Sequence, residues 1–190
     1  MLVSLKELME DAEKGGYAVG AFNVSNLESL MAIMQAAEET GRGVILNYAE
    51  VHAPFLSMEQ AALIMLDAAK KAKVPVCVHL DHGSSMESCI QAIRLGFTSV
   101  MLDASAEDYE TNVRETKEIV RLAHSVGVTV EAELGHIFSS DMGLAESPKE
   151  AETLESFDSA EDVYTDPATA KDFVERTGVD VLAICLLYTS

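Results

Sequence analysis

Apolar residues along the chain gather in short runs, and amphipathic segments separate these runs from one another. The runs are typical of strands, at residues 16–22, 43–49, 74–80, 98–104, 128–134 and 179–184. Between them, apolar positions recur every three or four residues, which is the spacing of a helix with one buried face. We expect these helices near residues 25–41, 57–73, 84–95, 107–125 and 167–177. The chain therefore repeats a strand-then-helix unit.

Residues with strong local preferences mark the ends of several predicted helices. Ser25 and Ser57 stand where the first and second units pass from loop to helix, and serine is a favoured N-cap. Gly41 and Gly96 stand where two helices should end, and glycine readily adopts the left-handed conformation that closes a helix. These positions support the predicted boundaries.

A strand-and-helix repeat indicates parallel strands joined by right-handed crossovers. A doubly wound sheet and a (β/α)₈ TIM barrel both satisfy it, but no GxGxxG follows the first strand as it would in a nucleotide-binding sheet. Polar residues able to do chemistry recur where strands end: Asn23, Asp81, His82, Asp103 and Glu133. A barrel brings such strand ends to one rim. We therefore predict an α/β barrel, of which only about the first six β/α units are present.

Charge narrows the range of partners. The chain of 190 residues has 13 basic and 32 acidic residues and a formal charge of −19. A protein of this charge repels nucleic-acid phosphates and anionic lipid surfaces, so we expect neither as a partner. Ten of the acids and two lysines lie between residues 141 and 172, which indicates a solvated loop.

Cellular location follows from segments that we do not find. No apolar run approaches the ~20 residues that a membrane span requires, and the N-terminus has no signal-peptide core. The three cysteines form no CxxC pair, which favours reduced thiols. We therefore expect a cytoplasmic protein.

The stretch HLDHG, residues 79–83, concentrates titratable groups at the exit of a strand. His79 should share a face with Asp81, and we expect it to be a core histidine bonded to the backbone. His82 could bind a divalent metal, whereas Asp81 could act as a general base or support the metal from outside. Taken alone, the pair could equally be structural. Asp103 and Glu133 at the next two strand ends favour a functional site.

The motifs GGYAVGAFNVSNLE, VPVCVHLDHG, FTSVMLDAS, VTVEAELG and YTDPATAKDFVERTGVDVLAI occur in this order. With them the chain resembles the class II, metal-dependent fructose- and tagatose-bisphosphate aldolases, also called ketose-bisphosphate aldolases. The resemblance runs from about Leu5 to Ile184. It implies a TIM barrel that is a lyase, reversibly cleaving a ketose 1,6-bisphosphate to dihydroxyacetone phosphate and an aldehyde phosphate.

The resemblance also implies a role for each strand-end residue. Asp81 would be the catalytic acid/base on the C4 hydroxyl, and His82 would bind the catalytic Zn²⁺ or another divalent metal. Asp103 and Glu133 would line the metal pocket, which could hold a second metal or a monovalent cation. Asn23 would lie near the phosphorylated ketose substrate. The parent enzyme is expected to be a homo-oligomer, a dimer or a tetramer.

Two positions depart from the family pattern. Ala49 stands where a Ser or Thr usually contacts a substrate phosphate, which leaves the choice between fructose, tagatose and another ketose open. Glu50 and His52 are nearby and could be rim residues. The segment 136–147 replaces the usual glycine-rich acidic loop, so no catalytic glutamate is assigned within it.

The C-terminal end departs most. The family's next metal histidine would fall at position 190, where Ser190 stands. We expect residues 1–184 to be a partial barrel domain and residues 185–190, CLLYTS, to be a non-native, adaptor-like tail. The fragment itself should then be inactive.

Other functions stay open. They are another metal-dependent phosphosugar barrel enzyme, such as an epimerase, and a non-catalytic barrel that binds ligands. A Schiff-base aldolase is disfavoured because no lysine stands at a predicted strand end.

Overall fold

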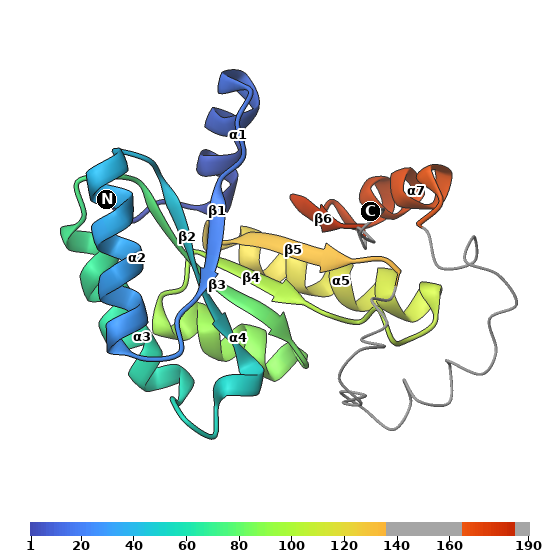
Figure 1. Cartoon of the computed structure of the whole chain (residues 1–190). Coiled ribbons are helices and arrows are strands. Elements are labelled where there is room, and N and C mark those ends of the chain that lie inside the picture. Colours follow the sequence, from blue (N-terminus) through green and yellow to red (C-terminus); the bar gives the residue numbers. More distant parts are fainter. Residues whose placement is uncertain (136–164, 185–190) are drawn as a thin grey trace, which may run out of the picture.

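The computed structural model describes residues 1–135 and 165–184, which form one curved sheet of parallel strands with helices packed against it (Figure 1). The strands lie in chain order across the sheet, each paired in parallel with the next. They are β1 (Gly20–Asn23), β2 (Val44–Ala49), β3 (Val76–Gly83), β4 (Ser99–Leu102), β5 (Thr129–Glu133) and β6 (Val181–Ala183). The predicted α/β fold, a partial barrel of six parallel strands, is confirmed.

Helices connect successive strands, as predicted. They are α2 (Leu27–Thr40), α3 (Met58–Lys71), α4 (Met86–Leu95), α5 (Tyr109–His124) and α7 (Pro167–Thr177), with a short 3₁₀ helix, η1 (Glu50–His52), after β2. One helix, α1 (Leu5–Gly15), precedes the first strand and was not predicted. None of the described helices combines the length and apolarity needed to cross a bilayer.

The main core lies between the sheet and the helices that follow the strands. Alternate strand residues, such as Leu46 and Tyr48 of β2 and Val78 and Leu80 of β3, are fully buried in it. Because side chains alternate along a strand, the residues between them point to the other, concave side of the sheet. Chemistry and main-core packing thus lie on opposite faces.

The concave side has its own small core. Leu5 and Leu8 of α1 pack there against Ile45 of β2 and Cys77 of β3. These strand residues lie near the N-terminal ends of their strands, so α1 closes that end of the barrel interior. The opposite end, where the strands finish, is left for polar side chains.

Local capping explains where three helices begin. The N-cap of α2 is Asn26, whose side chain accepts a hydrogen bond from the backbone N–H of Ser29. The prediction of Ser25 as this cap was therefore wrong by one residue. Ser57 caps α3 as predicted. α4 begins at Met86, two residues later than expected, because Ser85 caps it.

The first strand differs from its prediction. Residues 16–22 were expected to be a buried strand, but β1 covers Gly20–Asn23 and all four residues are exposed. In the described part of the chain β1 pairs with β2 alone, so its other edge has no neighbour. Apolar composition predicted a strand here, whereas burial depends on partners that composition does not supply.

Three predictions concern residues outside the described ranges. Most of the acidic loop at 141–172, the departing segment 136–147 and the tail 185–190 fall there. They stay predictions.

The exposed edge of β1 leads to a first prediction. Phe22 is 51% exposed on this strand, and an apolar unpaired edge is a template for association. We expect Phe22→Lys to weaken self-association of the 190-residue chain by roughly tenfold, measured by sedimentation equilibrium. Leu63→Lys on α3 is the matched control, since Leu63 is 74% exposed but lies away from the sheet edge. Equal effects of both variants would contradict association through β1.

Candidate metal and proton-transfer site

Four titratable side chains gather where three neighbouring strands end. Asp81 and His82 are among the last three residues of β3, and Asp103 directly follows β4. Glu133 is the last residue of β5. Because the strands are parallel, their carboxyl ends reach the same rim of the sheet, as predicted (Figure 1).

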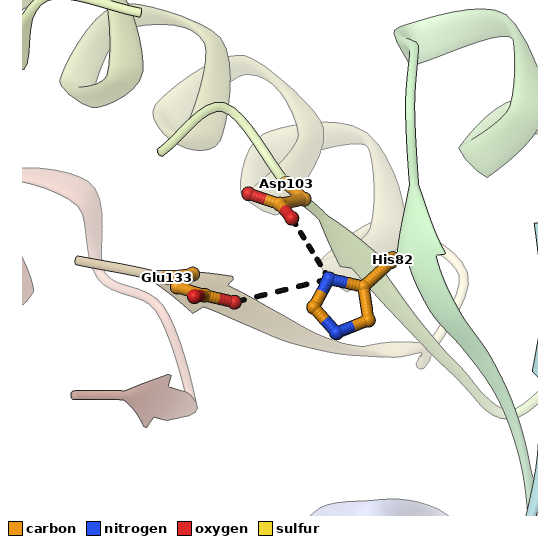
Figure 2. A group of neighbouring side chains, drawn as sticks. All are labelled: His82, Asp103 and Glu133. Atoms are coloured by element: carbon orange, nitrogen blue, oxygen red, sulfur yellow. Dashed lines mark hydrogen bonds and ion pairs between the residues drawn. The ribbon is translucent and has the colours of Figure 1, made fainter. Parts of the chain in front are cut away.

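The imidazole of His82 faces two carboxylates at the ends of the next two strands, β4 and β5 (Figure 2). Its Nδ1 lies 2.8 Å from Oδ2 of Asp103 and 3.8 Å from Oε2 of Glu133. One ligand atom from each of the three side chains lies within 4.8 Å of the others. Imidazole nitrogen and carboxylate oxygen are ligands that Zn²⁺ and related divalent cations accept. The donor set therefore fits a divalent cation.

The backbone at His82 is unusual. Among the described residues it alone combines a side chain with a positive φ, of 50°. Such a conformation costs roughly 1–3 kcal/mol and persists only where the surroundings hold it. Gly83 follows for a steric reason, since a Cβ there would lie 2.6 Å from the carbonyl oxygen of Met101. The backbone N–H of Asp103 donates to the carbonyl of Gly83 at 3.0 Å, which holds the turn against β4.

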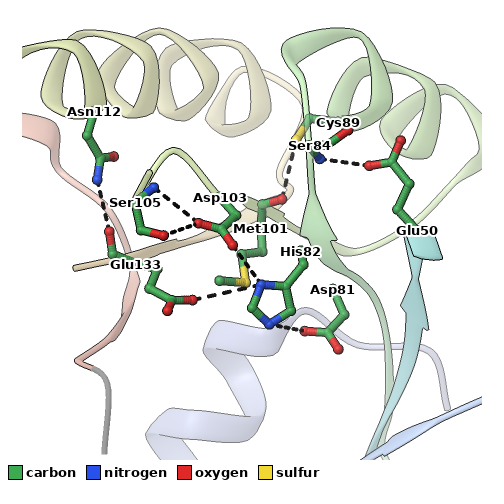
Figure 3. A network of polar contacts seen from close by, with 10 residues as sticks. All are labelled: Glu50, Asp81, His82, Ser84, Cys89, Met101, Asp103, Ser105, Asn112 and Glu133. Atoms are coloured by element: carbon green, nitrogen blue, oxygen red, sulfur yellow. Dashed lines mark hydrogen bonds and ion pairs between the residues drawn. The ribbon is translucent and has the colours of Figure 1, made fainter. Parts of the chain in front are cut away.

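Hydrogen bonding sets the charge of the His82–Asp103 pair. The bond to Asp103 raises the pKa of His82 to about 9, against an opposing effect of burial, and the charges of the surrounding carboxylates add to the rise. Burial alone would raise the pKa of Asp103. Bonds from His82 and from the hydroxyl and backbone N–H of Ser105 outweigh it and lower that pKa (Figure 3). Without a metal the pair is an imidazolium and a carboxylate.

Glu133 behaves differently because no side-chain hydrogen bond in the described structure offsets its burial. Burial raises the pKa of its carboxyl to about 7, and repulsion from Asp103 adds to the rise. Its backbone carbonyl accepts a hydrogen bond of 2.9 Å from the side chain of Asn112 on α5. Helix α5 thus fixes the end of β5, and with it the third possible ligand.

Asp81 lies beside this group without joining it. Its Oδ1 is 4.0 Å from Nε2 of His82, on the ring edge opposite Asp103 (Figure 3). Burial raises the pKa of Asp81, although His82 and a hydrogen bond from Asn47 oppose the rise. A carboxylate with a raised pKa next to a metal-competent group is suited to accept a proton.

His79 is a core histidine, but its partners differ from those expected. It is 3% exposed, and its Nδ1 lies 2.8 Å from Oγ of Ser99 rather than from a backbone group. Its Nε2 lies 3.4 Å from Oε2 of Glu131. Burial lowers the pKa of His79 to about 3 and raises that of Glu131 to about 7. The contact is therefore not an ion pair at neutral pH, because the imidazole is uncharged.

Glu131 and Asn47 are inward-facing polar residues that the sequence interpretation missed. Glu131 stands two residues before Glu133, and Asn47 two before Ala49, so strand alternation could have revealed both. The side-chain oxygen of Asn47 is buried and has no hydrogen-bond partner among the described residues. An unsatisfied buried oxygen next to Asp81 is consistent with a polar ligand at this rim.

Comparison with known proteins identifies the family. Residues 3–186 match the profile of the family described as class-II fructose-bisphosphate aldolase. The chain belongs to this class II aldolase family.

Sequence relatives agree with this membership. The class II aldolase chain is 46% identical over 186 residues to the fructose-bisphosphate aldolase of Thermus caldophilus, covering 98% of this chain and 57% of that protein. It is 42% identical over 188 residues to the fructose-bisphosphate aldolase of Staphylococcus aureus strain N315. This match covers 97% of this chain and 61% of that protein. The chain thus spans about 60% of the length of these relatives.

Solved structures show the same partial match. The YdjI aldolase of Escherichia coli K12 superposes with a TM-score of 0.80 at 39% identity, over 97% of this chain and 61% of that one. The fructose-bisphosphate aldolase of Campylobacter jejuni superposes with a TM-score of 0.71 at 25% identity. This superposition covers 93% of this chain and 54% of that one. The class II aldolase family is metal-dependent, and the three possible ligands around His82 are side chains that could hold a divalent cation.

Two further positions of the class II aldolase rim were singled out in the sequence. Asn23 ends β1 and lies opposite Asn47 in the sheet. Among the described residues no hydrogen bond or ion pair joins Asn23 to the His82 group, so its substrate role stays a prediction. Ala49 lies opposite Asp81 in the register of β2 and β3. A side chain longer than that of alanine at position 49 would therefore lie beside Asp81.

The raised pKa of His82 leads to a second prediction. We expect an NMR titration of the metal-free chain to give His82 a pKa near 9 instead of near 6.5. The folded pKa is raised, so the stabilisation from protonated His82 is complete below pH 6.5 and is lost as the pH rises through about 9. Asp103→Asn should move the midpoint downward. Asp67→Asn is the control, because Asp67 pairs with Lys71 on α3 and not with His82.

The same proton competes with a metal for Nδ1. Between pH 7 and 9 the affinity for Zn²⁺ should rise by about tenfold per pH unit, measured by competition with a chelator. An affinity independent of pH would contradict His82 as a ligand.

Proposed function

We propose that this chain supplies the metal-binding and proton-transfer part of an enzyme that reversibly cleaves a ketose 1,6-bisphosphate. The products would be dihydroxyacetone phosphate and an aldehyde phosphate. The observation that carries the proposal is Asp81, whose pKa is raised and whose carboxylate lies 4.0 Å from His82 in a group able to hold a cation. Family membership supplies the reaction class.

The residues divide the chemistry between them. His82, Asp103 and Glu133 would hold Zn²⁺ or another divalent cation, and the carboxylates could also serve a second metal or a monovalent cation. A bound divalent cation would act as a Lewis acid and stabilise negative charge on the ketose oxygens. Asp81 would take the proton from the C4 hydroxyl as the C3–C4 bond breaks, and return it in the condensation direction.

Burial makes Asp81 better suited to accept this proton. A surface carboxylate has a pKa near 4 and is a weak base. Partial withdrawal from water raises the pKa of Asp81 and makes its carboxylate a better proton acceptor. The charge of His82 and the side chain of Asn47 oppose this rise.

Activity of the printed chain is a separate question. About 40% of the length of these relatives lies outside the matched region. Only one of the three possible ligands is an imidazole, whereas catalytic zinc sites typically have at least two nitrogen or sulfur donors among their three protein ligands. We therefore infer that the 190-residue chain alone is inactive and that full activity needs the segments found in the relatives. Location in the cytoplasm and assembly into a dimer or tetramer stay predictions.

A third prediction tests the division of roles in the complete enzyme. Asp81→Asn should lower kcat by roughly 10²-fold or more, because the amide cannot accept the proton, while metal content stays unchanged. His82→Ala should lose metal and activity together. Turnover is measured by triose-phosphate release and metal content by atomic absorption. Equal metal loss in both variants would make Asp81 structural, and full activity with a strong chelator present would refute the metal mechanism.

A fourth prediction concerns Ala49, which has no hydroxyl to offer a phosphate. Ala49→Ser in the complete enzyme should lower KM for a bisphosphorylated ketose, by an amount corresponding to about 1.5–3 kcal/mol if nothing else makes this contact. Steady-state kinetics with fructose and tagatose bisphosphates measure the change. An unchanged or higher KM would indicate that another group already binds that phosphate, or that the natural substrate lacks it.

A further inference from the structure

The connection between β3 and α4 carries the two most important residues of the proposed site. β3 ends at Gly83 and α4 begins at Met86, so only two residues link them. Asp81 and His82 are followed by Gly83 and then by this link, and His82 has the positive φ of 50°. Any movement of the link would displace both side chains, and the left-handed backbone makes relaxation favourable unless neighbours prevent it.

Glu50 holds this connection from the neighbouring strand. It is the first residue of η1, directly after β2. Its Oε2 accepts a hydrogen bond of 2.7 Å from the backbone N–H of Ser84 (Figure 3). Its Oε1 accepts a second bond, of 2.5 Å, from the hydroxyl of Ser88 in the first turn of α4. Both oxygens of one carboxylate therefore bind the same short segment.

These bonds do more than cap the helix. α4 already has its own cap, because the side chain of Ser85 accepts from the backbone N–H of Ser88. Glu50 binds one residue earlier, at Ser84, between the end of the strand and the cap. It therefore fixes the turn relative to β2, a separate element, and not the helix relative to itself.

The turn is held from both sides. On the β4 side, the carboxylate of Asp103 is hydrogen-bonded to the imidazole of His82. The backbone N–H of Asp103 donates to the carbonyl of Gly83. On the β2 side, Glu50 is the partner of Ser84 and Ser88. His82 is thus placed between a contact that acts on its ring and a contact that acts on the backbone just after it.

We propose that Glu50 is a positioning residue that holds Asp81 and His82 in place for the metal and the substrate. The inference rests on the proposed function, since it gives that site a support that neither the family match nor the donor set assigns. Glu50 does not touch the reacting atoms. Groups that orient metal ligands from outside typically change metal affinity or activity by 10–100-fold when they are removed.

The experiment compares Glu50→Ala, Glu50→Gln and a matched control in the complete enzyme. Glu59→Ala is the control, because Glu59 also binds α4 through its carboxylate, accepting 2.6 Å from the side chain of Gln91, but on the outer surface away from the turn. The readouts are Zn²⁺ affinity by chelator competition, hydrogen exchange of segment 81–85, kcat and KM, and thermal stability of the metal-free protein.

We expect Glu50→Ala to weaken Zn²⁺ binding by about tenfold or more and to accelerate exchange in segment 81–85. The amide oxygen of Glu50→Gln can still accept from the N–H of Ser84, so this variant should recover most of the affinity. Glu59→Ala should leave both readouts unchanged. kcat should fall more than KM rises in Glu50→Ala, because Asp81 is displaced together with His82.

Other outcomes separate this inference from the proposed function. Unchanged affinity and exchange in Glu50→Ala, or a loss of thermal stability alone, would overturn the role of Glu50 while wild-type metal binding and aldol cleavage stand. A wild-type enzyme that binds no divalent cation would refute the proposed function instead. Exchange in segment 81–85 would then still show whether Glu50 holds the turn, and unchanged exchange would refute that as well.

Discussion

The parallel pairing of β2 through β5 is the constraint on which the rest of this molecule depends. Parallel strands in register direct alternate side chains to the same face and bring their carboxyl ends to the same rim. The outward set is apolar and fully buried against the helices, which stabilises the sheet. The inward set changes along each strand, from Cys77 near the α1 end of β3 to His79 and then Asp81. Stability and chemistry are therefore built from alternate residues of the same strands.

At the rim, burial and hydrogen bonding act against each other, and the balance differs for each carboxyl group. Asp103 has three bonds from His82 and Ser105, which outweigh burial and keep it ionised. Glu133 has no comparable side-chain bonds in the described structure, so burial dominates and raises its pKa to about 7. Burial also raises the pKa of Asp81, although His82 and Asn47 oppose the rise. Burial and hydrogen bonding thus shift the pKa values of three similar side chains differently, which would suit the proposed division between cation binding and proton transfer.

The strained backbone of His82 links this electrostatic arrangement to the fold. A left-handed residue at the end of a strand turns the imidazole toward Asp103 and Glu133. Gly83 permits the close approach of β4, and Glu50 and Asp103 hold the turn from its two sides. The geometry of the site therefore depends on a residue outside it as well as on the possible ligands.

Much of this arrangement could be predicted from local sequence. Apolar runs and helical spacing located all six strands and the helices between them, because burial on one face imposes its period on the sequence. The same pattern placed Asp81, His82, Asp103 and Glu133 at strand ends. Helix α1 was missed because it precedes the repeat and covers the interior end of the barrel, where it completes no strand-and-helix unit.

Only the tertiary structure decided the distances between side chains, their hydrogen-bond partners and their exposure to solvent. Sequence alone could not show that His79 binds Ser99, since that contact joins two strands 20 residues apart. Nor could it show how far each residue of β1 is exposed, because burial of a residue depends on its neighbours in space and not on its own composition. Glu50 is the clearest case. Its residue type and position were visible, but its contact with the turn after His82 arises only when β2 and β3 pair, since hydrogen bonds act over a few ångströms in space regardless of separation along the chain.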